Sequence, residues 1–518
     1  MAIVRNILAA AALVVLAAAL YVPHLDTAPV YPGHDEVQFG RQAYSLATTG
    51  RDLIGRRRPL YFAEKDFLAG REPMSIYATA ALLLNRRPSV RLIRLPTALV
   101  GVLNVLLMFG LARQIFKSDS IAWAAAAMLA LAPAHFIYSR VGVDVIYPLP
   151  FVMIWLWALH LYFERPQARW LAVAGLAMSV GMYSYLVATV MMPIFFVMTA
   201  IAAARRFSVR AYGAMAVAFF VPLVPLAIWE ATHPERHTSL VSSYKLYDGT
   251  RFNILQGAKD ALSYFSLSVR TDSYWNCLNP SFLFFSGDSS LMNSTRLVGC
   301  FLLAMGILIP LGVVHIWNRR RTPFNLVVIA GLLLSPLPSV LTAEVATRRV
   351  ILIVPFAVLI AGHGVQYLAQ HRRYAARAVC IVLLLWMPLQ FARFHRDYLG
   401  DYRVRSAPWF GGNILGGMNQ LIDLQSDARP PLYISDGVWY AEQYWEFSLV
   451  SRGRDPLLAQ TRYISGLRGD PTGLPRGTLM LVSTGEPLEA AVQRDGWLAI
   501  RSIAEPNDVR SFVIYEHR

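Results

Sequence analysis

Long apolar runs fill the chain from its N-terminus to about residue 394, and short polar connections separate them. In lipid, every backbone polar group must find a partner within its own segment, and about 20 apolar residues achieve this as a helix. The pattern therefore predicts a polytopic α-helical membrane protein with about 11 transmembrane helices. The predicted spans are residues 7–22, 95–116, 121–138, 145–163, 170–185, 186–204, 212–229, 297–317, 324–341, 350–368 and 376–394.

The chain changes character after residue 394. Residues 395–518 have an ordinary polar composition, and about 120 residues suffice for one small domain. Strand-like runs mixed with a helical stretch predict an α/β layer fold. We therefore expect a membrane domain at 1–394 and a small C-terminal extramembrane α/β domain at 395–518. The predicted strands are 431–435, 478–484, 498–503 and 511–515, with a helix at 440–449.

Positive charge predicts how the chain is oriented. Every second connection between spans is short and basic, which is typical of the cytoplasmic side. The N-terminus is then cytoplasmic in an inner (plasma) membrane, and the α/β domain is external or periplasmic, as are the long segments 23–94 and 230–296. A cleaved signal peptide is the alternative for the first run, because residues 17–19 are Ala-Ala-Ala. The basic connections contain Arg113, Lys117, Arg165, Arg169, Arg205, Arg206, Arg210, Arg319, Arg320, Arg321, Arg372, Arg373 and Arg377.

Composition narrows the class of partner. The 518 residues are 56% hydrophobic and 15% charged, with a net charge of +16. The basic residues lie at helix ends, which indicates contact with membrane lipids and no nucleic-acid partner. Cys277, Cys300 and Cys380 have neither the spacing of a zinc site nor that of a disulfide framework.

The first external segment contains two adjacent carboxylates, Asp35 and Glu36, at the start of a helical pattern. An acidic residue in this position is often only a helix cap or a partner of the helix dipole. The alternative is general acid–base chemistry at the membrane surface. The same segment also contains several arginines, and they favour a catalytic role for the acidic pair.

Arginines 56–58 and Arg71 follow the acidic pair, and Met74–Leu84 reads as a helix too short to span a bilayer. Arginine binds phosphate oxygens in bidentate fashion and stays charged, so Arg58 and Arg71 are candidates for contact with a lipid phosphate. Simple contact with lipid headgroups is the alternative for any single arginine.

Two further external turns contain candidate residues. Arg140 and Asp144 end one predicted span, where a plain ion pair is the alternative to substrate binding. Arg348 and Arg349 lie at the last external turn, where the orientation rule does not require arginine. The aromatic segment 272–296 is either an interfacial belt or a wall on which a sugar stacks.

Four patches, taken in order and spacing, resemble a GT-C glycosyltransferase. The resemblance is to the broad family of dolichyl-phosphate-mannose protein mannosyltransferases and bacterial lipid A aminoarabinose transferases (glycosyltransferase family 39-like), over roughly residues 1–350. The patches are Asp35-Glu36 with Ala43 and Tyr44; Arg71-Glu72-Pro73 with Tyr77; Arg94-Leu95-Pro96 with Leu111-Ala112-Arg113, Ala132-Pro133 and Ser139-Arg140; and Asn279-Pro280 through Phe284 with Gly287-Asp288.

The resemblance implies an inverting transfer of sugar from a polyprenyl-phosphate donor to a lipid, glycan or protein acceptor. Asp35 matches the family's catalytic acid, and Glu36 is its neighbour in the same motif. Several relatives have Lys-Pro-Pro where this chain has Arg71-Glu72-Pro73, so Arg71 is a less secure match to their phosphate-binding lysine. In the expected mechanism Asp35 is the general base, and Arg71, Arg348 or Arg349 stabilises the leaving phosphate.

No cofactor is required by the sequence, which lacks a Gly-rich phosphate loop, although a divalent cation held by carboxylates stays open. A membrane transporter or flippase is the main alternative function. Transporters place ionisable residues near the bilayer midplane, whereas these predicted spans are almost free of charge. A non-catalytic scaffold is a third interpretation, and it predicts that the first-loop acids are dispensable.

Overall fold

A computed structural model gives the protein's structure and describes every residue except 1, 65–66, 245–253, 262 and 427–428. The chain divides into two compact units, neither of them continuous in sequence. We call the first the membrane unit; it comprises Met1–Pro23, Arg51–Ser75 and Pro96–Arg396. We call the second the α/β unit; it comprises His24–Gly50, Ile76–Leu95 and Asp397–Arg518.

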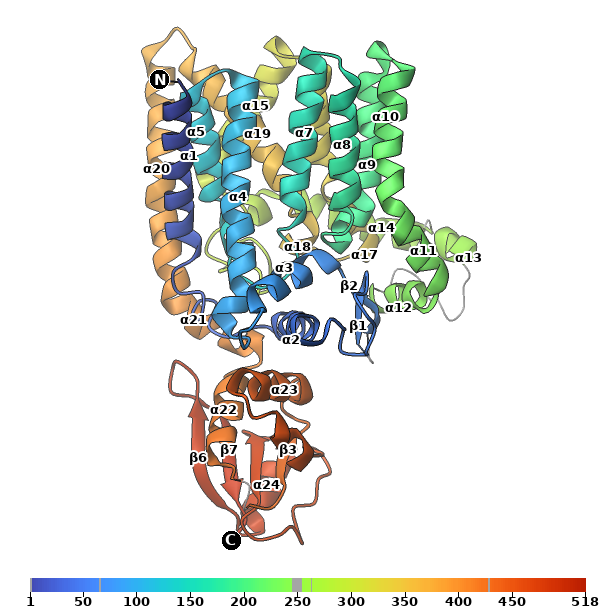
Figure 1. Cartoon of the computed structure of the whole chain (residues 1–518). Coiled ribbons are helices and arrows are strands. Elements are labelled where there is room, and N and C mark those ends of the chain that lie inside the picture. The colour runs from blue at the N-terminus through green and yellow to red at the C-terminus, as the bar shows by residue number, and fades with distance from the viewer. Residues whose placement is uncertain (1, 65–66, 245–253, 262, 427–428) are drawn as a thin grey trace. The chain divides into compact units, whose positions relative to one another are not determined.

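The membrane unit is built from long apolar helices, several of which lie side by side in Figure 1, among them α7, α8 and α10. Each predicted span coincides with one helix or with two consecutive ones. These helices are α1 (Ala2–Tyr21), α4 (Val90–Phe116), α5 (Asp119–Ala130), α6 (Pro133–Tyr138), α7 (Pro148–Glu164), α8 (Ala168–Gly181), α9 (Leu186–Ala203), α10 (Val209–Phe220), α11 (Val224–Thr232), α15 (Leu303–Arg319), α16 (Pro323–Leu334), α17 (Leu337–Thr342), α19 (Ile353–Ala369) and α20 (Tyr374–Leu399).

Proline explains where some predicted spans are interrupted. The run 121–138 is divided into α5 and α6 just before Pro133, because the ring of proline is not compatible with an uninterrupted helix. Within the described residues, five helical segments are long and apolar enough to cross a membrane. The structure therefore supports a multi-pass membrane protein without confirming the predicted number of about 11 spans.

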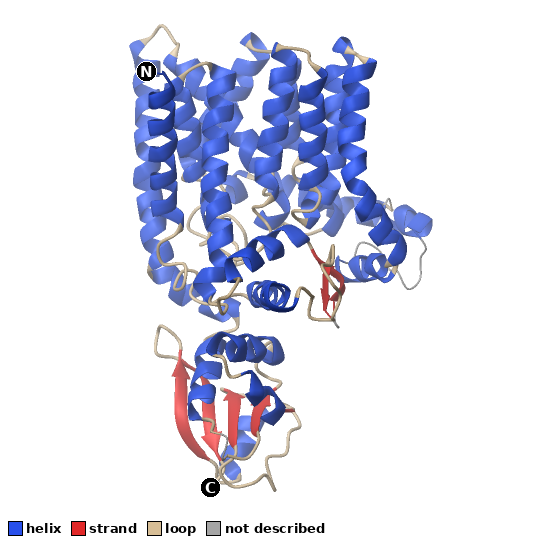
Figure 2. Cartoon of the chain, viewed as in Figure 1, coloured by secondary structure: helices blue, strands red, loops and turns tan. Residues whose placement is uncertain are grey.

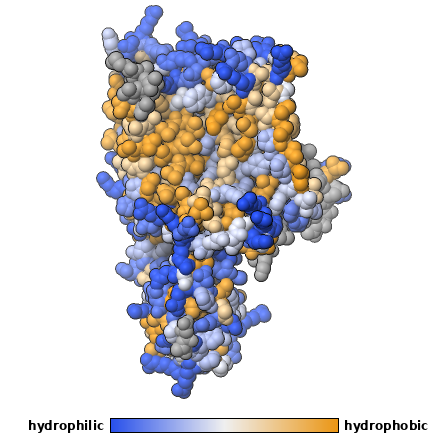
Figure 3. Space-filling view, viewed as in Figure 1, coloured by the Kyte–Doolittle hydropathy of each residue, from blue (hydrophilic) through white to orange (hydrophobic). Residues whose placement is uncertain are grey.

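Lipid contact is indicated by the surface of the membrane unit. Large apolar side chains stand exposed on its outer helices, as on α20, where Leu385 is 63% exposed. Figure 3 shows hydrophobic residues over the middle of the helices and hydrophilic residues at their ends. Soluble monomers rarely expose contiguous apolar surface on this scale, so these faces are the ones expected to meet lipid.

Short elements connect the long helices of the membrane unit. A two-stranded antiparallel hairpin, β1 (Phe62–Glu64) with β2 (Phe67–Arg71), precedes α3 (Pro73–Leu83), so the short helix predicted near Met74–Leu84 is confirmed. The remaining short helices are α12 (Glu235–Tyr244), α13 (Ile254–Ala261), α14 (Tyr264–Leu278) and α18 (Thr347–Val350).

The α/β unit contains a five-stranded sheet with the strand order β4-β3-β5-β7-β6, drawn in red in Figure 2. Strand β3 is parallel to β4 and β5, and β7 is antiparallel to β5 and β6. The α/β fold predicted for the tail is confirmed. The elements are α21 (Asp401–Ser406), α22 (Ile414–Leu424), β3 (Leu432–Ser435), α23 (Ala441–Arg452), β4 (Thr461–Ile464), β5 (Leu479–Ser483), α24 (Pro487–Arg494), β6 (Leu498–Ala504) and β7 (Arg510–Glu516).

Helix α2 (His34–Thr49), which carries the acidic pair, belongs to this α/β unit although more than 380 residues separate it from the first strand of the sheet. Val37 of α2 and Ile93 at the start of α4 are completely or almost completely buried in the core that also contains Ile434 of β3 and Leu481 of β5. The apolar face of α2 therefore completes the core of the C-terminal domain, and this packing fixes where its first turn lies.

Candidate functional site

Asp35 lies in the first turn of α2 but does not cap the helix. The N-cap residue is Gly33, and the capping interaction comes from Glu36, whose Oε2 accepts the Gly33 N–H at 3.0 Å. Asp35 Oδ1 lies 3.4 Å from His34 Nε2, and the Asp35 side chain is 42% exposed. Of the two adjacent carboxylates, only Asp35 is accessible to a substrate, because Glu36 is 1% exposed.

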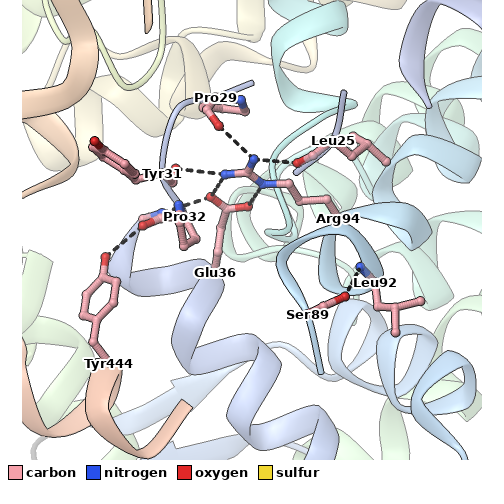
Figure 4. A network of polar contacts seen from close by, with 10 residues as sticks. Leu25, Pro29, Tyr31, Pro32, Glu36, Ser89, Leu92, Arg94 and Tyr444 are labelled. Atoms are coloured by element: carbon pink, nitrogen blue, oxygen red, sulfur yellow. Dashed lines mark hydrogen bonds and ion pairs between the residues drawn. The ribbon is translucent and has the colours of Figure 1, made fainter. Parts of the chain in front are cut away.

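Glu36 is held by Arg94 in a buried network (Figure 4). Arg94 Nε donates to Glu36 Oε1 at 2.7 Å, and a terminal guanidinium nitrogen donates to Oε2 at 3.0 Å. The same guanidinium donates to the backbone carbonyls of Leu25, Pro29 and Tyr31 at 2.7, 3.0 and 2.9 Å. The guanidinium thus joins the chain before α2 to the carboxylate inside α2, and the first turn becomes rigid.

Helix α23 holds α2 from the other side. The Tyr444 hydroxyl donates to the carbonyl of Pro32 at 2.8 Å, and Arg41 pairs with Glu446. A Cβ added at Gly40 would lie 3.0 Å from both Ile93 and Phe447, so the absence of a side chain at Gly40 allows this close packing. The position of Asp35 is therefore determined by residues from the C-terminal domain as well as by its own helix.

An aromatic cluster borders the acidic turn, and the sequence did not predict it. The His34 ring stacks on Tyr440 with centroids 4.3 Å apart and planes 2° apart, and it meets the edge of Trp439 at 5.0 Å. Trp439 and Tyr440 are 39% and 37% exposed, although both are large aromatics. Tyr440 has a φ of 49°, a conformation that costs free energy for a bulky residue and that often occurs at ligand-binding positions.

A second group of candidate residues comes together in the membrane unit, around two tyrosines. The half-buried Tyr244 lies within electrostatic reach of Glu72, Arg71, Arg349 and Asp144. Asp144 and Arg349 are also charged neighbours of Tyr185, and Arg348 is a third. We call this set the arginine–tyrosine cluster; it comprises Arg71, Glu72, Asp144, Tyr185, Tyr244, Arg348 and Arg349.

Glu72 and Asp144 form an acidic pair within this cluster. Both side chains are buried, at 5% and 6% exposed. Burial raises the pKa of Glu72. The positive charges of Arg236 and Arg71 lower this pKa, as does a hydrogen bond with Asp144. Two buried carboxyls in hydrogen-bond contact favour sharing one proton, because both cannot ionise without strong repulsion.

The two arginines of the last external turn are held by Glu344. Arg348 pairs with Glu344 Oε1, and Arg349 Nε lies 3.2 Å from Oε2. The Arg349 guanidinium also lies over the Tyr244 ring, 4.9 Å from its centroid. Asp288 supports this turn, since its Oδ2 accepts the N–H of Thr347 at 2.7 Å. The Gly287-Asp288 loop quoted for the resemblance therefore positions the arginines.

Two other predicted residues, Arg140 and Arg58, have different described surroundings. Arg140 donates to the carbonyls of Tyr21 and Leu20 at 2.8 and 3.3 Å, which caps the C-terminus of α1. Arg58 is exposed and has a φ of 44°. Among the described residues, no group of three or more His, Cys, Asp or Glu is arranged to hold a metal ion.

Comparisons with known proteins match this architecture. Residues 72–229 match the family model of the dolichyl-phosphate-mannose-protein mannosyltransferases. The structure is similar to ArnT from Cupriavidus metallidurans in the apo state, over 97% of both chains, with a TM-score of 0.60 and 14% identity. The chain has the fold of a GT-C glycosyltransferase. ArnT bound to undecaprenyl phosphate gives a TM-score of 0.56 with 12% identity over 97% of both chains.

The GT-C fold is also found in the Archaeoglobus fulgidus oligosaccharyltransferase in complex with Zn and sulfate. The similarity covers 96% of this chain and 72% of that one, with a TM-score of 0.52 and 12% identity. No curated protein sequence matches the chain. These matches confirm the resemblance to GT-C glycosyltransferases predicted from the sequence, and none of the three named structures is a transporter.

Several residues of the two sites were missed from sequence. Arg94 was quoted only for the resemblance, although a charged residue at the start of an apolar helix is itself a signal of a buried partner. Tyr185, Tyr244, Trp439 and Tyr440 carried no signal, because aromatic residues are common throughout this chain, at 12% of its residues.

Proposed function

We propose that the chain is a membrane glycosyltransferase that moves a sugar, with inversion, from a polyprenyl-phosphate-linked donor to a lipid, glycan or protein acceptor. The observation that carries this proposal is the state of Asp35. It is the accessible member of an acidic pair whose other member is buried and fixed by Arg94. A general base must be reachable and must be presented from a fixed position, and Asp35 is exposed on a helical turn that Glu36 and Arg94 hold in place.

Asp35 acts as the general base. Its carboxylate accepts the proton of an acceptor hydroxyl while that oxygen forms a bond with the anomeric carbon of the donor. The bond between the anomeric carbon and the phosphate oxygen breaks, and polyprenyl phosphate leaves with the bonding electrons. Because the acceptor attacks from the face opposite the leaving group, the configuration at the anomeric carbon inverts. Such a base typically contributes about 10²–10⁴-fold to the rate.

The arginine–tyrosine cluster binds the donor phosphate. Arg71, Arg348 and Arg349 offer planar guanidinium groups that match phosphate oxygens, and they stay charged when partly buried. Such groups stabilise the charge that develops on the leaving phosphate. The solved structure of a similar protein, ArnT, with undecaprenyl phosphate supports a polyprenyl phosphate as the donor's carrier.

The exposed aromatic pair beside Asp35 binds the acceptor. Trp439 and Tyr440 border the His34–Asp35 turn, and exposed aromatic faces are typical of sites that recognise flat or ring-shaped ligands. In this proposal the C-terminal domain is part of the enzyme's acceptor site. On the orientation predicted from sequence, this domain lies on the external side of an inner membrane.

A direct transfer assay tests the function. Purified protein in detergent or nanodiscs is mixed with a panel of polyprenyl-phosphate sugars and candidate acceptors, and products are identified by mass spectrometry and by the anomeric configuration in NMR. We expect one donor to be consumed with release of polyprenyl phosphate and an inverted linkage in the product. Retention of configuration would contradict the mechanism, and transport of an intact lipid-linked sugar without cleavage would contradict the function.

A further inference from the structure

The membrane unit contains a cavity of about 560 Å³ that is separate from the arginine–tyrosine cluster. Glu164, the last residue of α7, lines this cavity, whereas Asp144 of the cluster lies four residues before Pro148, the first residue of α7. A helix of 17 residues extends about 25 Å, so the cavity and the cluster lie at opposite ends of α7. The volume falls in the range of sites that hold small ligands, about 300–1,000 Å³.

The charge of the cavity lining is positive. Lys117, Arg206 and Arg320 contribute three cations, and Glu164 contributes the one carboxylate among the lining residues. Glu164 is already neutralised, since Lys117 Nζ lies 2.8 Å from its Oε1 and Gln114 Nε2 donates to its Oε2 at 2.7 Å. Among the described residues, no carboxylate pairs with Arg206 or Arg320. Two positive charges therefore stay uncompensated at this cavity.

The start of α16 adds a further feature that favours an anion. Thr322, Pro323 and Asn325 line the cavity, and Thr322 Oγ1 accepts the N–H of Asn325 at the N-cap. The N-terminus of a helix carries a partial positive charge and is a common binding site for phosphate. This 12-residue helix thus directs its positive end towards the same space as the two arginines.

A buried histidine supplies the independent observation that points to a ligand. His363 lines the cavity and is 4% exposed, and its Nδ1 has no hydrogen-bond partner among the described residues. An unsatisfied buried polar atom costs about 1–3 kcal/mol, so a ligand oxygen at this position would remove that cost. The other walls are apolar and are formed by Ile115, Phe116 and Phe163. Such a lining suits an amphiphile with an anionic group and an apolar chain.

We propose that this cavity binds a phosphate group, most simply that of an anionic amphiphile, at the end of α7 opposite the arginine–tyrosine cluster. Arg206 and Arg320 bind the phosphate oxygens, the start of α16 contributes its dipole, and His363 contributes a ring nitrogen. The apolar wall accommodates the first part of an acyl or prenyl chain. On the orientation predicted from sequence, the cavity lies on the cytoplasmic side and binds lipid from the inner leaflet.

Binding of two separate probes tests the site and its ligand source. The full-length protein is measured with phosphatidylglycerol by native mass spectrometry from nanodiscs, and with inorganic phosphate by thermal shift. The test variant is Arg206→Gln with Arg320→Gln. The matched control is Arg319→Gln with Arg321→Gln, which removes the same charge next to the cavity from residues that do not line it. Both double variants are compared by gel filtration to verify folding.

We expect the Arg206/Arg320 variant to lose roughly tenfold or more in affinity for phosphatidylglycerol, which is the effect of losing about one charge-assisted hydrogen bond. The control is expected to bind as the wild type does. Arg206→Lys with Arg320→Lys is expected to restore part of the binding, since it keeps the charge without the bidentate geometry. If inorganic phosphate alone protects the wild type, and lipid does not, the site takes a soluble phosphate compound.

Two results would overturn the proposal. Equal losses in the test and control variants would mean that diffuse positive charge, and no built site, attracts the lipid. Unchanged binding of both probes in the Arg206/Arg320 variant would mean that no phosphate occupies the cavity. His363→Phe is a second test that does not depend on the arginine substitutions. It replaces the ring nitrogen by an apolar ring and leaves both arginines in place. We expect it to weaken binding as well.

Discussion

Arg94 and Glu36 form a fully buried ion pair, with Arg94 Nε 2.7 Å from Glu36 Oε1 and side-chain exposures of 0% and 1%. This pair divides the roles of the two adjacent acids. Glu36 holds the first turn of α2, and Asp35 stays accessible on the same turn. A buried pair of this kind contributes little net stability compared with apolar residues, but breaking it leaves one charge unpaired in the interior.

The first prediction concerns this pair. Glu36→Gln leaves the Arg94 guanidinium buried without a counter-charge, so we expect a loss of about 3–5 kcal/mol in the stability of the α/β unit. Thermal unfolding and limited proteolysis of the purified protein measure it. Asp423→Asn is the control, because it breaks the exposed pair with Arg452 in the same unit and should cost only about 0.2–1 kcal/mol. Equal effects of the two substitutions would contradict a structural role for Glu36.

The second prediction concerns the base. Asp35→Asn keeps the size of the side chain and removes its ability to accept a proton, so transfer should fall by about 10²–10⁴-fold. Expression, thermal stability and donor binding should stay at wild-type levels, because Asp35 does not cap α2. Initial rates of transfer, together with donor affinity from equilibrium binding, measure the two effects. A variant that transfers sugar at the parental rate would exclude Asp35 as the base and make Asp144 the next candidate.

The third prediction concerns the donor phosphate. Neutral replacement of Arg348 or Arg349 by Gln should weaken donor binding by roughly tenfold or more, since each replacement removes a charge-assisted hydrogen bond. Lysine should restore only part of the affinity. Binding of a fluorescent polyprenyl-phosphate analogue measures the effect. The control is Arg296→Gln, an exposed arginine that precedes α15, and wild-type binding in both site variants would move the phosphate site elsewhere.

The fourth prediction concerns the aromatic pair. Tyr440→Gly removes the ring but suits the positive φ at this position, so the fold should tolerate it. We expect this substitution and Trp439→Ala to raise the KM for the acceptor by several-fold, about the size of one lost aromatic contact, while donor affinity stays constant. Tyr463→Ala, which removes an exposed aromatic from β4, is the control. An unchanged acceptor KM would remove these rings from the acceptor site.

The fifth prediction concerns orientation. Reporter fusions after Ala204 and after Arg396 should report opposite sides of the membrane, with the second outside. Residues Ala204–Arg206 begin the basic connection after α9, whereas Arg396 lies near the end of α20. Paired alkaline phosphatase and fluorescent protein fusions make this measurement. A result that places both positions on the same side would refute the predicted topology.

The sequence by itself determined the elements that depend on local pattern. Apolar runs predicted the membrane helices, and strand-like runs predicted four of the five strands of the C-terminal sheet, because hydropathy and periodicity act over a few residues. The strand β4 was missed because Thr461–Ile464 is short and carries an arginine within it. The acidic pair Asp35-Glu36 was visible in local sequence as a candidate site, and the family resemblance singled out Asp35 within it.

Tertiary structure alone decided which residues act together. Glu36 meets Arg94 across 58 positions, and Tyr444 meets the carbonyl of Pro32 across 412. Tyr244, Arg71 and Arg349 likewise come from three distant segments of the membrane unit. No local pattern encodes such contacts, because they depend on how separate helices pack once their apolar faces are buried. The same packing made α2 a part of the C-terminal domain's core and so left one carboxylate buried and its neighbour exposed.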